Sequence, residues 1–557
     1  MNKWFNKNNI IFGAIIVVMA VLLFQGVHQI YHQDEYTWVG LVDHSDKIGW
    51  DVHPPVALSL LKVTGYLFGY GNLRVLPAFF AILNLILLYF VSKKLSANKS
   101  VALLAGFLFA FNVYSLIAGL QIDIDGAILP FFVLASYNAY LRISDNKRLW
   151  FPIFILSLIG GFLTKLSFIL FVGALIVDYY LAHKHENHFQ LKKIASLSGL
   201  ALVLFGFVAL AFNFFSPDKF SHVLTYAGGF KSFDFRSRAY LDLGFKILKS
   251  FVWLSPLLFL PVFYALAKPD LRHRYRFWLI YLLFNFTFYT VLFDFSKLTI
   301  ERYFMFTIAP AAIIAAEVLY PFFTNLKNKK SYLSVATISI ILTGIATLVL
   351  SFKYQILPLD PKIAYFHYLK SFNLRFLIPF TGGSGPIGFY FSAMFIFWFW
   401  ALMFLAFVGY LFWRKKQNLL LTIIVVAGLI YNTLFIIEFL RGSFYGSVPN
   451  IARQTVDYVN TDPDIKLNQV ITYYNIAPWD LKVSGKYASR FYTAPTRDYS
   501  ATLTNSRGYY MIVDFPAISK DSLYWHLLQR CPIIKQFDDK DIHSYVFDCH
   551  RLPASKK

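Results

Sequence analysis

Three short polar segments of the chain contain side chains that could transfer protons. Such segments are notable because the chain has only 30 acidic residues among 557. These side chains are Asp34, Glu35, His53, Asp123 and Asp125. A carboxylate within hydrogen-bond reach of a hydroxyl group can remove its proton as a general base. Carboxylates together with a histidine can also hold a divalent cation, for which Asp34, His53 and Asp125 are the candidates. We therefore expect the three segments to meet at one face and form the edge of an active site.

Basic side chains in later segments complement these carboxylates. Lys165 lies between two short apolar runs, and Arg302 and Tyr303 begin another apolar run. Guanidinium groups hold phosphate oxygens through paired hydrogen bonds, and ammonium groups attract them as point charges. We expect Lys165, Arg302 and Tyr303, together with His53, to contact an anionic phosphate group.

Each of these residues also has a purely structural interpretation. Asp34 and Asp125 can cap helices, because Asp is common at helix starts. Lys165 can extend its long side chain to the membrane surface, and Arg302 and Tyr303 can anchor a helix at the interface. The residue types leave both interpretations open, and the mutual positions of the side chains distinguish between them.

The elements that must position these residues are membrane helices. Hydrophobic residues make up 57% and charged residues 15% of the chain, against ~45–50% and ~25% in soluble proteins. The mean hydropathy is +0.53. The net charge of +22 does not indicate nucleic-acid binding, because the basic residues fall in short runs between apolar segments, as membrane orientation requires. The chain is expected to be a polytopic membrane protein.

A window of about 19 residues finds about thirteen apolar segments that could be transmembrane helices. They are residues 9–27, 73–92, 100–118, 126–141, 150–164, 166–182, 196–215, 249–267, 277–293, 303–322, 332–352, 387–413 and 418–439. The segments 150–164 and 166–182 are short, because about 15 residues rise only ~22 Å against a hydrocarbon core of ~30 Å. We expect these two to tilt, to thin the bilayer or to form a partly re-entrant hairpin.

The basic runs predict the orientation in the plasma membrane. If the N-terminus is cytoplasmic, every inside loop carries Lys or Arg, as the positive-inside rule requires. The candidate site then lies outside the cytoplasm. The outer loop 28–72 contains an apolar stretch at 56–70 that is too short to span, so we expect an interfacial helix there. The inside loops are too short to form a nucleotide-sugar site, so a glycosyl donor has to arrive through the membrane.

Beyond a transmembrane domain of residues 1–440, residues 441–557 indicate a small extracytoplasmic α/β domain. Helical spacing at 451–459 and 522–529 alternates with strand-like runs rich in Val, Ile and Tyr. The polarity of this region is that of a soluble domain.

Both cysteines of the chain, Cys531 and Cys549, lie in this domain and flank two strand-like runs. They are equidistant from Lys540, so a hairpin centred there places them opposite each other. A disulfide is expected in an oxidising exterior. Two reduced thiols packed in a core are the alternative.

The order of polar motifs along the membrane part resembles that of the GT-C membrane glycosyltransferases. The motifs are Asp34-Glu35 after the first apolar run, Pro54-Pro55 before an apolar helix, Arg74 with Pro77, Asp125, Leu163 to Lys165, and Arg302-Tyr303 with Pro310. More narrowly, the pattern is similar to the dolichyl-phosphate-mannose protein mannosyltransferase superfamily, in the bacterial branch of the aminoarabinose transferases of lipid A and the RgtA/B/C/D-like transferases. The resemblance covers about residues 9–440 and is strongest over 28–170.

The resemblance implies a glycosyltransferase that moves a sugar from a polyprenyl-phosphate donor to a hydroxyl group of a cell-envelope lipid, glycan or protein. It implies that Asp34 is the general base and that Asp125 is the carboxylate at the start of the fourth span. The aminoarabinose transferases have Lys-Pro-Pro where this chain has His53-Pro54-Pro55, which puts an aminoarabinose substrate in doubt. An inverting single displacement is expected. The family has metal-dependent and metal-independent members, so a divalent metal is allowed but not required.

Two other protein classes also handle lipid-linked sugars. A lipid-linked saccharide flippase would be polytopic too, but transporters place functional charges near the bilayer midplane and often consist of repeated halves. This chain instead gathers its acids at one predicted face and ends in an outer domain. An O-antigen polymerase or ligase would lack the early Asp-Glu and Pro-Pro motifs. A transferase is therefore the main prediction and a flippase its alternative.

Overall fold

The protein is represented by a computed structural model that describes most of the chain. The described residues are 7–32, 34–44, 53–183, 191–218, 238–292, 301–325, 354–358, 363–381, 385–413, 417–468, 470–473, 491–494 and 508–550, with shorter pieces between 220 and 225, between 334 and 352, and at 415. The chain divides into two compact units. Unit 1 comprises Met1–Val27, Leu41–Tyr332 and Gly409–Val425, and unit 2 comprises His28–Gly40, Leu333–Val408 and Val426–Lys557. The predicted domain boundary near residue 440 stays a prediction.

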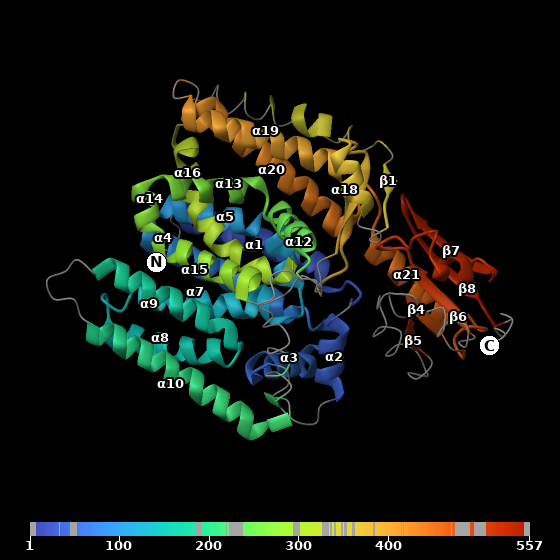
Figure 1. Ribbon diagram of the computed structural model, residues 1–557, viewed down its shortest axis with the longest axis horizontal. Helices are drawn as coiled ribbons and strands as arrows, with labels where there is room; N and C mark the ends of the chain where they lie inside the picture. Colours follow the sequence, from blue (N-terminus) through green and yellow to red (C-terminus); the bar gives the residue numbers. More distant parts are fainter. Residues whose placement is uncertain are drawn as a thin grey trace. The chain divides into compact units, whose positions relative to one another are not determined.

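Unit 1 is a bundle of helices, since apolar segments in a bilayer have to satisfy their backbone polar groups internally. Its elements are α1 Lys7–Val27, α3 Pro55–Phe68, η1 Tyr70–Asn72, α4 Val75–Ser96, α5 Lys99–Ala110, α6 Val113–Leu120, η2 Ile124–Ile128, α7 Leu129–Tyr140, α8 Lys147–Phe162, η3 Leu166–Phe168, α9 Ile169–His183, α10 Leu191–Phe215, α12 Tyr240–Leu254, α13 Pro256–Ala267, α14 Pro269–Arg274, α15 Arg276–Thr287, η4 Phe288–Leu292, η5 Glu301–Thr307 and α16 Ile308–Asn325. Within the bundle α4 packs against α5, α6 and α7, and α16 packs against α5 and α13. Figure 1 shows α8, α9 and α10 alongside one another.

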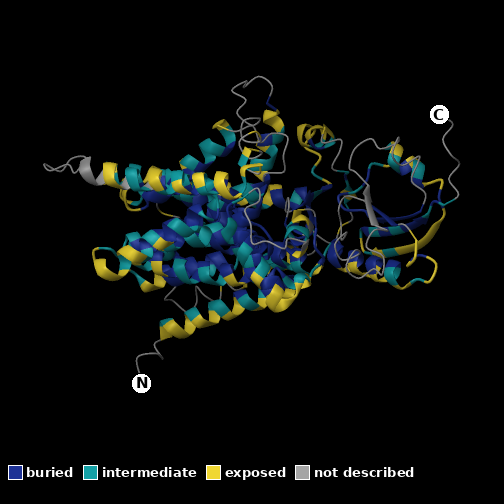
Figure 2. Cartoon of the chain, turned by 90° about the horizontal axis from the view of Figure 1, so that it is seen from below, coloured by how far each residue is buried: buried dark blue, intermediate teal, exposed yellow. Residues whose placement is uncertain are grey.

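Burial follows the arrangement of this bundle. Buried residues are concentrated in its interior, whereas the helix that leads from the N-terminus is largely exposed (Figure 2). On that helix the apolar side chains of Val17 and Phe24 are 61% and 68% exposed. Apolar side chains so exposed are unfavourable in water and favourable in lipid, which agrees with a membrane-embedded bundle.

Two of the expected spans are broken helices rather than continuous ones. The pair α5 and α6 is bent by 66°, and the pair α12 and α13 by 103°. At the first break the Asn112 side chain caps α6 by accepting the N–H of Tyr114 at 3.0 Å. At the second break Ser255 has a left-handed φ of 68°. The Asn112 amide also donates to the carbonyl of Leu254 at 2.9 Å, so the two breaks are joined.

Within the described residues, fewer than the predicted thirteen helices are long enough by themselves to cross a membrane. Among the described residues, seven helices are long and apolar enough to cross a membrane, or nine if each bent pair is one span. Three other expected spans are shorter helices: α8 has 16 residues, and α7 and α15 have 12 each beside a five-residue π-helical turn. The expected span at 332–352 lies largely outside the described residues. The predicted count of thirteen is therefore not confirmed.

The apolar stretch at 56–70 does form a helix, α3. Its side chains divide into two faces, with Leu61 1% exposed and Tyr66 86% exposed. Proline occupies its first turn, as is favoured there. The amphipathic division suits a helix that lies at a membrane surface, and this interfacial location stays a prediction.

The segment Leu333–Val408 of unit 2 contains a small three-stranded sheet. Strand β1 Gln355–Ile356 is parallel to β2 Phe376–Phe380, and β2 is antiparallel to β3 Phe389–Ser392. The helix α18 Ile363–Lys370 connects β1 to β2. Two long apolar helices follow, α19 Ala393–Phe412 and α20 Gln417–Arg441, whose adjoining ends within Gly409–Val425 belong to unit 1.

The C-terminal part of unit 2 is an α/β structure, as predicted. Its five-stranded sheet has the order β5-β4-β6-β8-β7, with β5, β4 and β6 parallel and β6, β8 and β7 antiparallel. The elements are α21 Val448–Thr461, β4 Val470–Tyr473, β5 Phe491–Ala494, β6 Tyr509–Val513, α24 Leu523–Leu528, β7 Ile533–Asp539 and β8 Ile542–Asp548. The β7–β8 hairpin turns at Lys540, and a disulfide joins Cys531 to Cys549 at its open end.

Candidate active site

Asp123 and Asp125 occupy the turn between α6 and α7. The Asp123 carboxylate caps η2 by accepting the N–H of Ile124 at 2.5 Å. Gly126 lets η2 lie directly on α6, because a Cβ at this position would be 2.4 Å from the carbonyl oxygen of Ala118. This close packing buries both acidic residues, which are 5% and 8% exposed. Two buried carboxylates in one turn need cationic partners.

Lys165, between α8 and η3, is the partner of Asp125. Its Nζ lies 2.7 Å from both carboxylate oxygens of Asp125, and the two side chains are 13% and 8% exposed. An ammonium group has three N–H donors, of which this carboxylate accepts two. The pair joins the end of α8 to η2 and leaves the third donor of Lys165 for another group.

Arg302, in η5, is the partner of Asp123. The guanidinium Nη1 lies 2.7 Å from Asp123 Oδ2, with the side chains 18% and 4% exposed. Gln121 Nε2 donates to the same carboxylate oxygen at 3.3 Å. The pair joins η5 to the turn that follows α6, so Arg302 is held in one position by a buried anion.

The aromatic ring of Tyr303 contacts both cations. Lys165 Nζ is 5.1 Å and the guanidinium carbon of Arg302 is 4.9 Å from its centroid. Arg302 Nη2 also donates to the Tyr303 hydroxyl at 3.0 Å, and the ring of Tyr289 stacks on that of Tyr303 at 5.2 Å. These cation–π contacts complete what we call the cation–carboxylate cluster: Asp123, Asp125, Lys165, Arg302 and Tyr303.

The charges of this cluster stabilise one another. Burial opposes ionisation of Asp123, but the charges of Arg302 and Lys165 outweigh it and lower the pKa of Asp123 below its usual value. Burial likewise opposes the charge on Lys165, but Asp125 outweighs it and raises the pKa of Lys165. Arg302 and Lys165 thus favour ionised Asp123, and Asp125 favours charged Lys165, whereas burial raises the pKa of Asp125 against the opposing charge of Lys165.

His53 belongs to the same neighbourhood of unit 1. It precedes α3, and the first turn of α3 is bonded to the Leu-Thr-Lys segment, because the N–H of Val56 donates to the carbonyl of Leu163 at 3.1 Å. The charge of His53 also contributes to the lowered pKa of Asp123. The structure thus brings together the predicted phosphate-contacting residues and the two predicted site carboxylates of unit 1.

Asp34 and Glu35 lie in unit 2, at the start of α2 Asp34–His44. Glu35 is fully buried; its Oε2 accepts the N–H of His32 at 3.3 Å, and its own N–H donates to the His32 carbonyl at 3.0 Å. Glu35 therefore contacts the backbone at the helix start, and its predicted part in catalysis stays a prediction. The Asp34 side chain is exposed, so it is the solvent-accessible carboxylate of the pair.

A second buried ion pair directly precedes Arg302 and was not predicted. Lys249 Nζ in α12 lies 3.0 Å from Glu301 Oε1, with side chains 7% and 6% exposed. The Tyr114 hydroxyl donates to the backbone carbonyl of Glu301. These contacts fix the chain beside Arg302, so Lys249 and Tyr114 position the cluster. The signal in the sequence was a lysine within an apolar helical run, since such charges are rare and usually functional.

The described residues do not fit a divalent metal. In this part of the chain no group of three or more His, Cys, Asp or Glu side chains is placed to hold one. Both oxygens of Asp125 contact Lys165, and Asp123 contacts Arg302 and the N–H of Ile124. The two carboxylates already neutralise cations of the protein.

Comparison with known proteins supports this interpretation of the fold. Residues 52–212 match the family model described as dolichyl-phosphate-mannose-protein mannosyltransferase. A search of curated protein sequences finds no match. The fold is similar to that of ArnT from Cupriavidus metallidurans in the apo state, with a TM-score of 0.52 and 12% identity over 96% of this chain and 97% of that one. The structure of the same protein bound to undecaprenyl phosphate has a TM-score of 0.50 and 13% identity, over 96% of this chain and 97% of that one.

At such low identity the structural likeness concerns the fold, and the family model adds the match in sequence. The resemblance noted from the motifs is thereby confirmed. Over residues 52–212 the chain matches the dolichyl-phosphate-mannose-protein mannosyltransferase family model, and its fold is similar to that of the ArnT structures.

Proposed function

We propose that this protein transfers a sugar from a polyprenyl-phosphate donor to a hydroxyl group on a lipid, glycan or protein of the cell envelope. The observation that carries the proposal is the cation–carboxylate cluster, in which two partly exposed cations from separate segments are held beside one tyrosine ring by buried carboxylates. Cations fixed in this way suit a phosphate group, whose oxygens accept charge-assisted hydrogen bonds.

The polyprenyl carrier is supported by chemistry and by the comparison. ArnT from Cupriavidus metallidurans, which has this fold, has been solved with undecaprenyl phosphate bound. A lipid phosphate is an adequate leaving group once cations neutralise its developing charge. Lys165 and Arg302, with His53 nearby, are the residues that we assign to this phosphate.

The proposed reaction is a single displacement with inversion. The acceptor oxygen forms a bond to C1 of the sugar while the bond from C1 to the phosphate oxygen breaks, and the lipid phosphate leaves with the electron pair. The proton of the acceptor hydroxyl passes to a carboxylate, which we assign to Asp34 from the family resemblance and from its exposure. Because the leaving group is a phosphate, a second carboxylate acting as acid is unnecessary, unlike in glycoside hydrolysis.

The orientation is part of the proposal. The basic loops favour a cytoplasmic N-terminus, which puts the transferase site and the C-terminal α/β region outside the cytoplasm. The donor then reaches the site within the outer leaflet, and the acceptor comes from the envelope side.

The test is transfer in proteoliposomes from radiolabelled polyprenyl-phosphate sugars to candidate envelope acceptors. Asp34→Asn is expected to lower transfer by about 10²–10⁴-fold. Asp43→Asn, at an exposed acidic position near the other end of α2, serves as the matched control and is expected to retain it. Equal transfer by Asp34→Asn would exclude Asp34 as base. Movement of the donor lipid across the vesicle membrane without transfer would overturn the transferase in favour of a flippase.

A further inference from the structure

An apolar groove runs along one side of unit 1, away from the cation–carboxylate cluster. Its volume is about 880 Å³, near the upper end of the ~300–1,000 Å³ of ligand pockets. Its walls come from the facing sides of α12, α13, α15 and α16, and they are formed almost entirely by Leu, Ile, Val and Phe side chains. The exposed apolar side chains of Phe263, Leu266 and Leu283 border it, so the groove opens sideways toward lipid.

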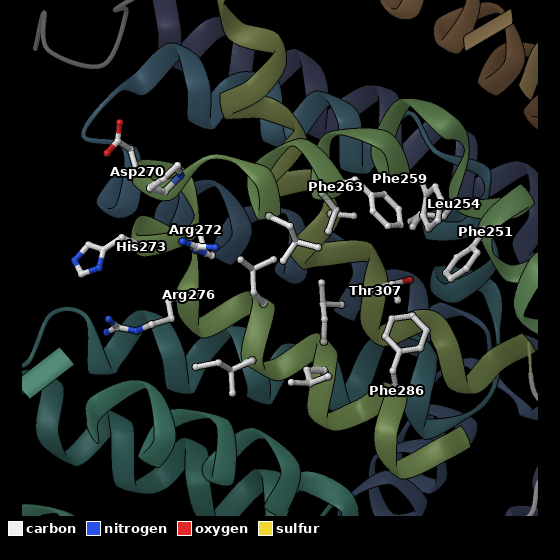
Figure 3. Close-up of a pocket in the computed structure, with 18 of the residues that line it drawn as sticks. Phe251, Leu254, Phe259, Phe263, Asp270, Arg272, His273, Arg276, Phe286 and Thr307 are labelled. Carbon is white, nitrogen blue, oxygen red and sulfur yellow. The ribbon is translucent and has the colours of Figure 1, made fainter. Parts of the chain in front are cut away.

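Basic side chains are confined to one end of this groove. Arg272, His273 and Arg276 lie there with Asp270, and Phe251, Leu254 and Phe259 lie at the other end (Figure 3). An apolar channel with cations at a single end matches an amphiphile that has a hydrocarbon chain and an anionic head.

The cations at this end differ in their partners. Arg276 Nε lies 2.7 Å from Asp178 Oδ1, so its charge is compensated within the protein. Arg272 and His273 are exposed, and neither forms an ion pair within the described part of the chain. Asp270 offsets one positive charge at this end of the groove, but Arg272 and the neighbouring exposed Lys268 together outnumber it, so this end attracts anions.

The groove and the cluster do not share residues. Neither Lys165 nor Arg302 lines the groove. Thr307, at the end of η5, lines it, and no residue of η4 does. The positive-inside pattern also assigns the segment 268–276 to the cytoplasmic side, opposite to the side expected for the donor phosphate. A polyprenyl donor with its phosphate at the cluster would therefore have its head at the wrong end of this groove.

We propose that the groove binds an anionic phospholipid, with an acyl chain against the apolar walls and the headgroup phosphate at Arg272 and His273. Basic pockets between membrane helices on the cytoplasmic side bind such headgroups, and each Lys or Arg near the surface adds to the attraction. The lipid fills space between α12, α13 and α15, and it stabilises α12, which carries Lys249. This binding does not depend on the proposed transferase function.

The test is native mass spectrometry and thermal unfolding of the full chain with phosphatidylglycerol, and with phosphatidylcholine as the neutral comparison. One tightly bound phosphatidylglycerol and a raised melting temperature are expected, with no such effect of phosphatidylcholine. Arg272→Ala is expected to weaken binding about fivefold. Arg148→Ala, at an exposed basic position of another predicted inside loop, is the matched control and should bind as the wild type does.

A second variant addresses the groove itself. Val262→Trp fills it and is expected to abolish retention of phosphatidylglycerol, while Val203→Trp, on a side chain that is 68% exposed on α10, leaves retention unchanged. Equal retention of both phospholipids, or unchanged retention in Val262→Trp, would overturn the proposal. Displacement of phosphatidylglycerol by undecaprenyl phosphate would overturn it too, because the groove would then belong to the donor chain.

Discussion

Unit 1 places basic side chains in two contrasting environments. Lys165 and Arg302 are 13% and 18% exposed and each bonds a buried carboxylate, whereas Arg272 and His273 are exposed at one end of an apolar groove. In the cluster the anions hold the cations at fixed positions, which suits one phosphate group in a reactive pose. At the groove the cations are exposed to solvent, which suits the headgroup of an anionic phospholipid on the predicted cytoplasmic side. We expect cations that take part in the transfer reaction to be ion-paired and buried, as Lys165 and Arg302 are. We expect cations that only attach a lipid to be exposed, as Arg272 is.

The largest expected effect comes from breaking a pair in the cluster. Lys165→Met leaves the Asp125 carboxylate buried without its cation, so we expect a loss of ~3–5 kcal/mol in stability and no measurable transfer. Thermal unfolding in detergent and the transfer assay measure these effects. Lys94→Met removes an exposed pair with Asp145, whose side chains are 36% and 46% exposed, and should cost less than ~1 kcal/mol.

The double variant Lys165→Met with Asp125→Leu separates stability from function. Replacing both partners of a buried pair by apolar residues is often neutral, so stability should return while transfer stays absent. If transfer returns together with stability, Lys165 has only a structural role.

A smaller effect is expected when charge is kept and geometry is changed. Arg302→Lys keeps a cation beside Asp123 but loses the planar guanidinium that bonds both the carboxylate and the Tyr303 hydroxyl. We expect kcat/KM to fall by ~10–100-fold with little loss of stability. At the groove Arg272→Lys should leave lipid binding unchanged, because only charge matters there. If Arg302→Lys and Arg272→Lys weaken function at their sites by the same factor, the geometry of the cation matters equally at the cluster and at the groove, and the proposed difference is wrong.

A positioning residue should have a still smaller effect. Tyr114→Phe removes the hydroxyl that donates to the Glu301 carbonyl, at a cost of ~1–3 kcal/mol in stability. Since this contact fixes the chain beside Arg302, kcat should fall several-fold while KM for the acceptor stays constant. A loss of stability with unchanged kcat would show that Tyr114 does not act through Arg302.

The smallest effect is a pH dependence. The pKa of Asp123 is lowered because the charge of Arg302 outweighs burial, so its contribution to stability is fully present above the unfolded pKa of 3.8. This contribution is lost as the pH falls through the lowered folded pKa. The difference in melting temperature between wild type and Asp123→Asn should be constant at neutral pH and narrow only below about pH 4. A difference that narrows near pH 6 would contradict the ionised pair.

The sequence predicted which residues form the cluster but not how they pair. Asp125, Lys165 and Arg302 stood out as charged residues at the ends of apolar runs. Their pairing depends on contacts between segments far apart in the sequence, which bring the turn after α6, the segment before η3 and η5 together. The breaks at Asn112 and Ser255 were not predicted either. Apolar composition cannot reveal such breaks, because both halves of a broken helix remain apolar.

Other features had weaker signals or none. Lys249 was visible as a charge in an apolar run, but its partner Glu301 is far away in the sequence. The groove is formed by ordinary apolar residues from helices distant along the chain, so no local pattern predicts it. The C-terminal strands and helices were predictable, since period-two alternation and turn residues are local signals.

The central claim is that the cation–carboxylate cluster binds the donor phosphate, and the most direct measurement compares binding of undecaprenyl phosphate with that of undecaprenol. The wild-type protein is predicted to prefer the phosphorylated lipid by at least about tenfold, the value expected for a charge-assisted hydrogen bond. Arg302→Gln is predicted to lose most of this preference, and Lys94→Ala to keep it. If Arg302→Gln prefers the phosphorylated lipid as strongly as the wild type does, the phosphate binds elsewhere and the claim is wrong.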